Sequence, residues 1–268
     1  MPYLAVTEQR SIYYEYNRGT RLPILMIHGW GMSCRVWDST VVALRQAGHG
    51  VVCFDQRGCG ESDKDFAEVS IESSAGDAIA LLDHLAIPRA VINGWSLGGA
   101  IAAETASRLG TRCAGLVLTT AATPRYTQAA DFPHGNPPGS TAETVKLLRE
   151  NRAAFLMGLT QAVCAVPQPE AVINWMWSIF MQTSPNADEA LAQLDTVDQR
   201  QLLAALQVPV LAMVGGKDLI VPPDICRLGA KIAPQGRLVE FAECGHAPFV
   251  EDGPRYRSEL LDFMAGLA

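Results

Sequence analysis

The chain of 268 residues lacks the features that mark membrane-bound, secreted and nucleic-acid-binding proteins. No apolar run approaches the ~18 residues that a transmembrane helix needs. Residues 1–8 do not join a basic segment to an apolar one, as a secretory signal does. Lys and Arg number 21 against 28 Asp and Glu and form no cluster, which argues against nucleic acid and anionic membranes as partners. We expect a cytoplasmic protein.

Metal and cofactor signatures are missing too. The seven cysteines are scattered and no two have C-x-x-C spacing, so the sequence indicates neither a zinc site nor a disulfide framework. Gly58-Cys59-Gly60 does not extend to G-x-G-x-x-G, and Gly215-Gly216-Lys217 is not part of a P-loop. We therefore predict no cofactor and no metal, and we expect most cysteines to be reduced and buried.

Hydrophobic residues make up 49% of the chain, enough for the core of one α/β domain. Short β-prone runs alternate with helical patterns up to residue 119 and again from residue 208. The predicted strands are 3–7, 11–16, 23–27, 51–54, 90–93, 114–119, 208–214 and 237–241, and the predicted helices are 36–46, 72–85, 97–109, 224–233 and 254–264. The first two strands indicate an antiparallel hairpin at a sheet edge. The remaining alternation predicts a mostly parallel, eight-stranded sheet with helices on both faces.

The alternation stops between residues 122 and 207, where helical patterns replace strands. The predicted helices there are 141–164, 169–182, 187–194 and 197–206. A helical insertion between two strands suggests a lid. We therefore divide the chain into a core domain, residues 1–121 and 208–268, and a helical cap subdomain, residues 122–207.

The stretch Gly94-Trp95-Ser96-Leu97-Gly98 has the form G-x-S-x-G and lies between a predicted strand and a predicted helix. This is the setting of a nucleophile elbow, whose turn is so tight that side chains at the two glycines would collide with the neighbouring strand and helix. The serine Oγ would then project above the sheet. The pentapeptide by itself is also compatible with a Gly-rich turn that carries an incidental serine.

Polar residues follow several predicted strands directly: His28, Asp55, Ser96, Asp218 and His246. The carboxyl ends of parallel strands form the edge at which ligands bind. Ser96, Asp218 and His246 also occur in the order of a Ser–Asp–His triad. Ser96 would be the nucleophile, His246 the base that removes its proton, and Asp218 the acid that orients His246.

The developing oxyanion needs donors, and the backbone N–H groups of Leu97 and Trp30 are the natural pair. Other interpretations remain for each polar residue. His246 could be a structural loop histidine, and Asp218 could cap the following helix. The other position for an acid, after strand 114–119, holds none. We expect His28 to anchor the oxyanion loop, and Asp55 and Arg57 to form an ion pair within their own loop.

These motifs together resemble the α/β-hydrolase superfamily over nearly the full length of the chain. The resemblance is carried by these segments: His28-Gly29-Trp30-Gly31, Asp55 to Ser62, Gly94 to Gly99, Gly216-Lys217-Asp218 and Gly245 to Phe249. Within the superfamily, most of them look like pimeloyl-carrier-protein methyl ester esterases. Residues 55–62 look more like general esterases, cofactor-free haloperoxidases and ring-cleavage hydrolases. The resemblance implies an α/β-hydrolase fold, the triad Ser96, Asp218 and His246, and the oxyanion hole Trp30 and Leu97.

A serine at position 96 excludes the relatives that use aspartate there, namely haloalkane dehalogenases and soluble epoxide hydrolases. We expect hydrolysis of a carboxylic ester or lactone, with carbon–carbon cleavage of ring-fission products, perhydrolysis or a slow-turnover ligand receptor as alternatives. The binding partner would be a small hydrophobic substrate. The sequence does not decide between a monomer and a homo-oligomer. The residues expected to bind its apolar group are Trp95, Trp175, Met176 and Phe180.

Overall fold

The computed structural model describes residues 2–267 and contains one sheet with the strand order β1-β2-β4-β3-β5-β6-β7-β8. Its strands are β1 (Tyr3–Ala5), β2 (Ser11–Asn17), β3 (Arg21–Ile27), β4 (His49–Phe54), β5 (Ala90–Trp95), β6 (Cys113–Thr119), β7 (Val210–Gly215) and β8 (Gly236–Phe241). The pairs β1–β2 and β2–β4 are antiparallel, and all other pairs are parallel. The predicted edge hairpin and parallel sheet are therefore confirmed.

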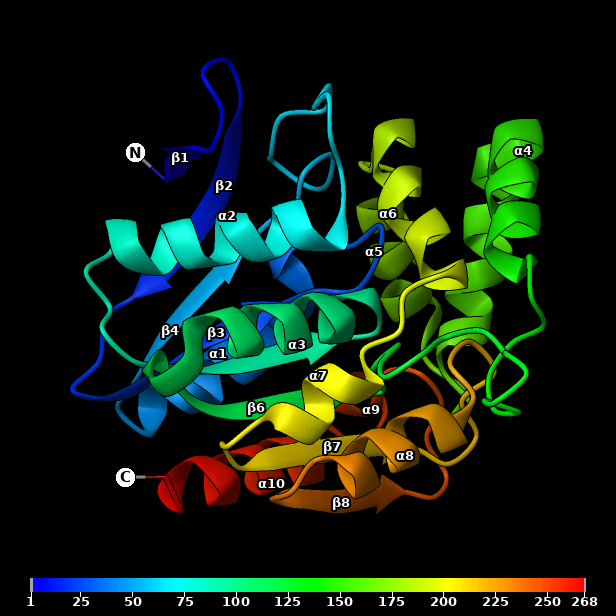
Figure 1. Cartoon of the computed structure of the whole chain (residues 1–268). Helices are drawn as coiled ribbons and strands as arrows, with labels where there is room; N and C mark the ends of the chain where they lie inside the picture. Colours follow the sequence, from blue (N-terminus) through cyan, green and yellow to red (C-terminus); the bar gives the residue numbers. More distant parts are fainter. Residues whose placement is uncertain (1, 268) are drawn as a thin grey trace.

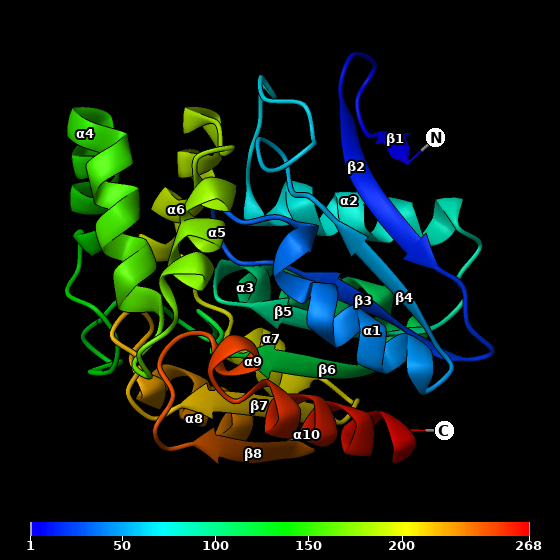
Figure 2. The same ribbon diagram turned by 180° about the vertical axis from the view of Figure 1, so that it is seen from behind.

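The central strands are buried on both faces because helices cover both. The covering helices are α1 (Asp38–Gln46), α2 (Ile71–His84), α3 (Leu97–Leu109), α8 (Pro223–Ile232), α9 (Pro248–Glu251) and α10 (Gly253–Ala265). Helices α2, α3 and α8 lie on the face toward the viewer in Figure 1, while α1 and α10 cover the face seen in Figure 2. Every residue of β4, β5, β6 and β7 is buried, which is why these strands read as continuous apolar runs.

An insertion follows β6, as expected, and stands beyond the carboxyl ends of the parallel strands (Figure 1). It contains α4 (Ser140–Val163), α5 (Glu170–Phe180), α6 (Asp188–Ala192) and α7 (Arg200–Ala205). Helix α4 is broken at Asn151, whose φ of −154° and ψ of 79° are not helical. The side-chain oxygen Oδ1 of Asn151 accepts the N–H of Ala154 at 3.1 Å and so caps the second half of the helix.

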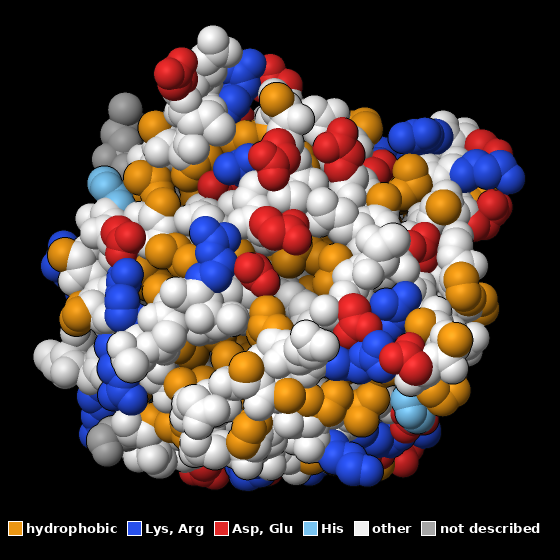
Figure 3. Space-filling model, in the orientation of Figure 1, with side chains coloured by type: hydrophobic (Ala, Val, Ile, Leu, Met, Phe, Trp, Pro, Cys, Tyr) orange, Lys and Arg blue, Asp and Glu red, His pale blue; other side chains and the backbone are white. Residues whose placement is uncertain are grey.

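Charge on the surface agrees with the composition. On the face shown in Figure 3, acidic and basic side chains are interspersed with apolar ones and form no field of one sign. Among residues 2–267, no helix combines the length and the apolar character that crossing a membrane requires.

Candidate active site

Ser96 occupies the sharp turn between β5 and α3. Its φ of +58° lies in the region that L-residues other than glycine rarely adopt, so the turn holds the serine under strain. The flanking glycines leave no room for a side chain. A Cβ at Gly94 would lie 2.0 Å from the carbonyl oxygen of Gly98, and one at Gly98 would lie 2.3 Å from that of His28. The local geometry is therefore the elbow that the pentapeptide predicts.

Asp218 and His246 meet at the same edge of the sheet. Asp218 Oδ2 lies 2.7 Å from His246 Nδ1, and their side chains are only 1% and 4% exposed. The other carboxylate oxygen accepts the backbone N–H groups of Ile220 at 2.8 Å and Val221 at 3.0 Å. Asp218 is thus held by its own loop and directed at the imidazole, rather than capping α8, which begins at Pro223.

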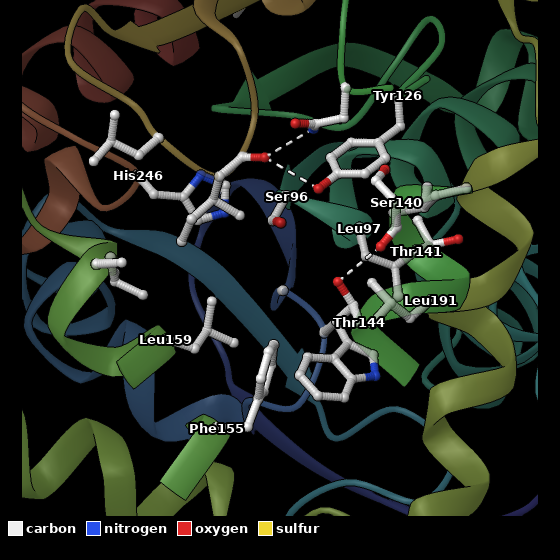
Figure 4. A pocket seen from close by; sticks show the side chains of 18 of the residues that line it. Ser96, Leu97, Tyr126, Ser140, Thr141, Thr144, Phe155, Leu159, Leu191 and His246 are labelled. Carbon is white, nitrogen blue, oxygen red and sulfur yellow. Dashed lines mark hydrogen bonds between the residues drawn. The ribbon is translucent and has the colours of Figure 1, made fainter. Parts of the chain in front are cut away.

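The backbone of His246 is anchored to three different parts of the chain. Its carbonyl accepts the indole N–H of Trp95 at 2.7 Å and the hydroxyl of Thr120 at 2.8 Å. Its N–H donates to the carbonyl of Val163, at the end of α4, at 2.7 Å. The histidine therefore bridges the sheet edge and the insertion. Both Ser96 and His246 line one cavity (Figure 4), and no hydrogen bond joins their side chains within the described residues. Such bonds are often long before substrate binds.

Glu251 fastens the same loop to the insertion. Its Oε2 accepts the N–H groups of Ala165 at 2.8 Å and Val166 at 2.9 Å, which follow α4. Its Oε1 accepts those of Gly245 at 2.9 Å and Ala247 at 3.2 Å, on either side of His246. We did not single out this glutamate from the sequence, because nothing in the pattern of residues 245–251 reveals which distant N–H groups its carboxylate would meet.

Two residues that line the cavity, Trp30 and Leu97, are buried. The backbone N–H group of neither residue donates to any acceptor among residues 2–267. Buried N–H groups are nearly always paired, so two that are free beside one serine are candidate donors to a ligand oxygen. This is the pair that the sequence proposes as the oxyanion hole.

His28 supports the Trp30 loop, as expected. Its Nδ1 lies 2.7 Å from the carbonyl of Gly29, and its Nε2 accepts the N–H of Gln56 at 3.0 Å. This pairing requires a neutral ring with the proton on Nδ1. Complete burial lowers the pKa of His28, and the approach of Asp55 opposes that effect only in part.

The expected ion pair between Asp55 and Arg57 is wrong. Asp55 instead accepts the N–H groups of Cys34 at 2.7 Å and Glu61 at 2.8 Å. Arg57 makes a bidentate pair with Asp77 of α2, with N–O distances of 2.7 and 2.8 Å. Burial raises the pKa of Asp77 while Arg57 opposes the rise. The two neighbours separate because Asp55 turns inward under its loop while Arg57 reaches across to the helix.

The cavity beside Ser96 has a volume of about 480 Å³, a size suited to a small molecule. Of the four residues expected to bind an apolar group, Trp95 and Phe180 line it, whereas Trp175 and Met176 do not. Only the last turn of α5 reaches the site, where Phe180 packs 6.1 Å from the Trp30 ring. Met176, one turn earlier, is fully buried outside the lining.

Most of the remaining wall comes from α4 and from the segments around Tyr126 and Ile220, which the sequence did not single out. The second half of α4 contributes residues at helical spacing: Phe155, Leu159, Ala162 and Val163. That spacing marks a helix face, but it does not show what the face covers. No group of three or more His, Cys, Asp or Glu in the described part of the chain could hold a metal ion.

Comparison with known proteins agrees with this geometry. The sequence profile described as the alpha/beta hydrolase fold matches residues 23–253. A pimeloyl-[acyl-carrier protein] methyl ester esterase from Neisseria meningitidis is 30% identical, with 91% of this chain and 94% of that protein covered. A non-heme haloperoxidase from Rhodococcus erythropolis is also 30% identical, with 98% and 99% covered. An esterase from Exiguobacterium antarcticum superimposes with a TM-score of 0.94 at 24% identity, over 98% of both chains.

Proposed function

The chain belongs to the α/β-hydrolase fold family, and from this premise we propose that it is a serine hydrolase that cleaves a carboxylic ester or lactone with a hydrophobic group. The observation that supports the proposal is the buried Asp218–His246 pair, 2.7 Å apart, beside a cavity that Ser96 also lines. A serine hydroxyl needs such a base to become a nucleophile. The fold supports this assignment, because each of the three residues follows the end of a different parallel strand, and these ends lie at one edge of the sheet.

In the first half of the reaction, His246 Nε2 takes the hydroxyl proton of Ser96 while Oγ attacks the ester carbonyl carbon. Asp218 keeps the proton of the ring on Nδ1 and stabilises the imidazolium. The carbonyl oxygen becomes an oxyanion, which accepts the N–H groups of Trp30 and Leu97. The intermediate then collapses, the bond to the alcohol oxygen breaks, and that oxygen receives the proton from His246. An acyl-enzyme on Ser96 remains.

Water completes the cycle. His246 removes a proton from a water molecule, whose oxygen attacks the acyl carbon, and the same two N–H groups stabilise the second oxyanion. Ser96 Oγ then leaves with the proton from His246, and the carboxylic acid is released. Trp95 and Phe180 would contact the apolar part of the substrate. We further propose that residues 122–207 act as the cap of this site, because residues of α4, together with Phe180 of α5, form much of its wall.

Labelling with a fluorophosphonate tests the assignment. We expect one label per chain, located on Ser96 by peptide mass spectrometry, and no label on Ser96→Ala. Loss of the nucleophile should lower kcat by about 10⁶ on a p-nitrophenyl ester, by analogy with a serine protease. Stoichiometric labelling of the Ser96→Ala protein would overturn the proposal.

Perhydrolysis is a second candidate, because one relative at 30% identity is named a haloperoxidase. Hydrogen peroxide would replace water in the second half-reaction. The acyl–Oγ bond would break, and a peroxycarboxylic acid would leave and oxidise bromide. Bromination that depends on both acetate and peroxide, and that Ser96→Ala lacks, would support this activity. Equal bromination by both proteins would exclude it.

A further inference from the structure

The break of α4 at Asn151 divides the cavity into two unlike walls. Before the break, α4 presents three hydroxyl side chains, those of Ser140, Thr141 and Thr144. After it, the same helix presents apolar side chains, among them Phe155 and Leu159. Figure 4 shows Tyr126 and the three hydroxyl residues on one side of Ser96, and Phe155 and Leu159 on another. A substrate in this cavity therefore meets an apolar wall and a polar one.

The polar wall offers more acceptors than donors. The hydroxyl proton of Tyr126 is used by the carbonyl of Ile220 at 3.1 Å, and that of Thr144 by the carbonyl of Ser140 at 2.9 Å. Asn136 donates its side-chain amide N–H to the same Ile220 carbonyl at 3.2 Å, while its side-chain carbonyl oxygen accepts no hydrogen bond from the described residues. The oxygens of these side chains keep lone pairs that only a ligand or water can use.

Ser140 differs from its neighbours. Its Oγ is out of reach of water, from the cavity as well as from outside the molecule, and it makes no hydrogen bond with any group in residues 2–267. A buried hydroxyl without a partner costs free energy that a partner supplied by a ligand would recover. Because Ser140 is among the residues that line the cavity, rotation of its side chain about the Cα–Cβ bond would bring this hydroxyl, which can both donate and accept, to a ligand there.

Full charges are absent from the wall. Within the described residues, no Asp, Glu, Lys or Arg lines the cavity. The guanidinium of Arg152, 5.9 Å from the Trp30 ring centroid, is bound by Asp188 at 2.9 Å. Burial, followed by the charges of Asp218 and Asp195, raises the pKa of Tyr126 to about 12, so the phenol remains protonated and those carboxylates oppose an anion.

From these contacts we propose a substrate class: a neutral ester or lactone that carries a hydroxyl or N–H group, which binds at Ser140 and Tyr126 while its apolar part packs on Phe155 and Leu159. The inference rests on the proposed ester hydrolysis and narrows it. A charged substituent would lose its hydration without meeting an opposite charge on the wall, which costs more than neutral hydrogen bonds return.

Isosteric esters test the class. Ethyl ω-hydroxyalkanoates of increasing chain length are compared with ethyl alkanoates in which a methyl group replaces the hydroxyl, and with ω-carboxylate and ω-ammonium esters. A second series consists of acetates of ω-substituted alcohols, in which the hydroxyl group and its counterparts lie on the alcohol part of the ester instead of the acyl part. Proton release in a pH-stat gives kcat/KM for each. At one chain length, we expect the hydroxyl ester to exceed its methyl isostere about 3- to 10-fold, and both charged esters to be the poorest substrates.

Two variants locate the effect. Ser140→Ala removes a hydroxyl that has no partner among residues 2–267, so it should leave stability unchanged while the hydroxyl-to-methyl ratio falls to about one. Tyr126→Phe should lower the same ratio, whatever it does to the absolute rates through its bond to Ile220. The matched control is Ser178→Ala, which removes an exposed hydroxyl of α5 that donates to the carbonyl of Trp175 at 2.7 Å.

The outcomes are separable. Hydrolysis of the alkyl esters with no preference for the hydroxyl at any length, or a preference that Ser140→Ala and Tyr126→Phe leave intact, overturns this inference and leaves ester hydrolysis standing. A charged ester as the best substrate also overturns it. If no ester is hydrolysed and the fluorophosphonate does not label Ser96, the proposed function falls and this inference with it.

Discussion

Replacing Glu251 by glutamine should impair catalysis, although the side chain never reaches the cavity. The carboxylate accepts four backbone N–H groups, two from the segment after α4 and two that flank His246. Glutamine keeps one oxygen and turns an amide toward donors that need an acceptor. Each hydrogen bond to a charged group contributes about 1.5–3 kcal/mol and each neutral one about 0.5–1.5 kcal/mol. The hydrogen bonds that hold the His246 loop in place should therefore be weakened by roughly 3 kcal/mol in total.

That loss limits the effect on rate. About 1.4 kcal/mol corresponds to a tenfold change, so we expect kcat/KM to fall about 10- to 100-fold in Glu251→Gln, mainly through kcat. The cause is a His246 loop that spends less time in its productive position.

Glu243→Gln is the matched control, because Glu243 lies close in sequence, has a side chain that is 77% exposed and forms a surface ion pair with Lys217. It should change kcat/KM by less than about twofold, since exposed ion pairs contribute little. The assay is steady-state ester hydrolysis over a range of pH, well below the melting temperature of each variant. If Glu251→Gln matches Glu243→Gln in kcat/KM, the carboxylate does not position His246.

Three further predictions follow from contacts at the site. Asp218→Asn keeps an oxygen for the N–H groups of Ile220 and Val221, but it favours the tautomer of His246 without a proton on Nδ1. The kcat of ester hydrolysis should therefore fall by about 10⁴. Full activity of this variant would show that Asp218 is not the acid of the triad. Gly98→Ala forces a Cβ to within 2.3 Å of the carbonyl oxygen of His28 and should lower Tm in thermal denaturation. Gly76→Ala in α2 is the control and should not lower Tm, because a Cβ there would meet the guanidinium of Arg108 at an ordinary 3.8 Å. Burial lowers the pKa of His28, so below about pH 6.5 the unfolded chain binds more protons than the folded protein does. The free energy of unfolding should therefore fall as the pH drops through that range. His28→Gln should flatten the dependence of Tm on pH, and an unchanged slope would contradict this role of His28.

Much of the core fold was predictable because its signals are local. Strands such as β4 and β6 are short and mostly apolar runs, and the structure changes their predicted limits by only one or two residues. The short helix α9 was not foreseen, because four residues carry no helical period. The long helix predicted over 141–164 exists, but its break at Asn151 did not show in the apolar spacing on either side.

The sequence by itself determined the turn at Ser96 and placed Asp218 and His246 after the strands that bring them to one edge. It could do so because two glycines dictate that turn, and because parallel strands necessarily end together. Only the tertiary structure decided that Arg57 pairs with Asp77, that Glu251 joins the insertion to the His246 loop, and that α4 builds two unlike walls. The first two are contacts between groups that lie far apart in the chain, and the third depends on how the two halves of α4 are oriented at the break. A charged side chain has many chemically equivalent partners, and only the folded geometry selects one.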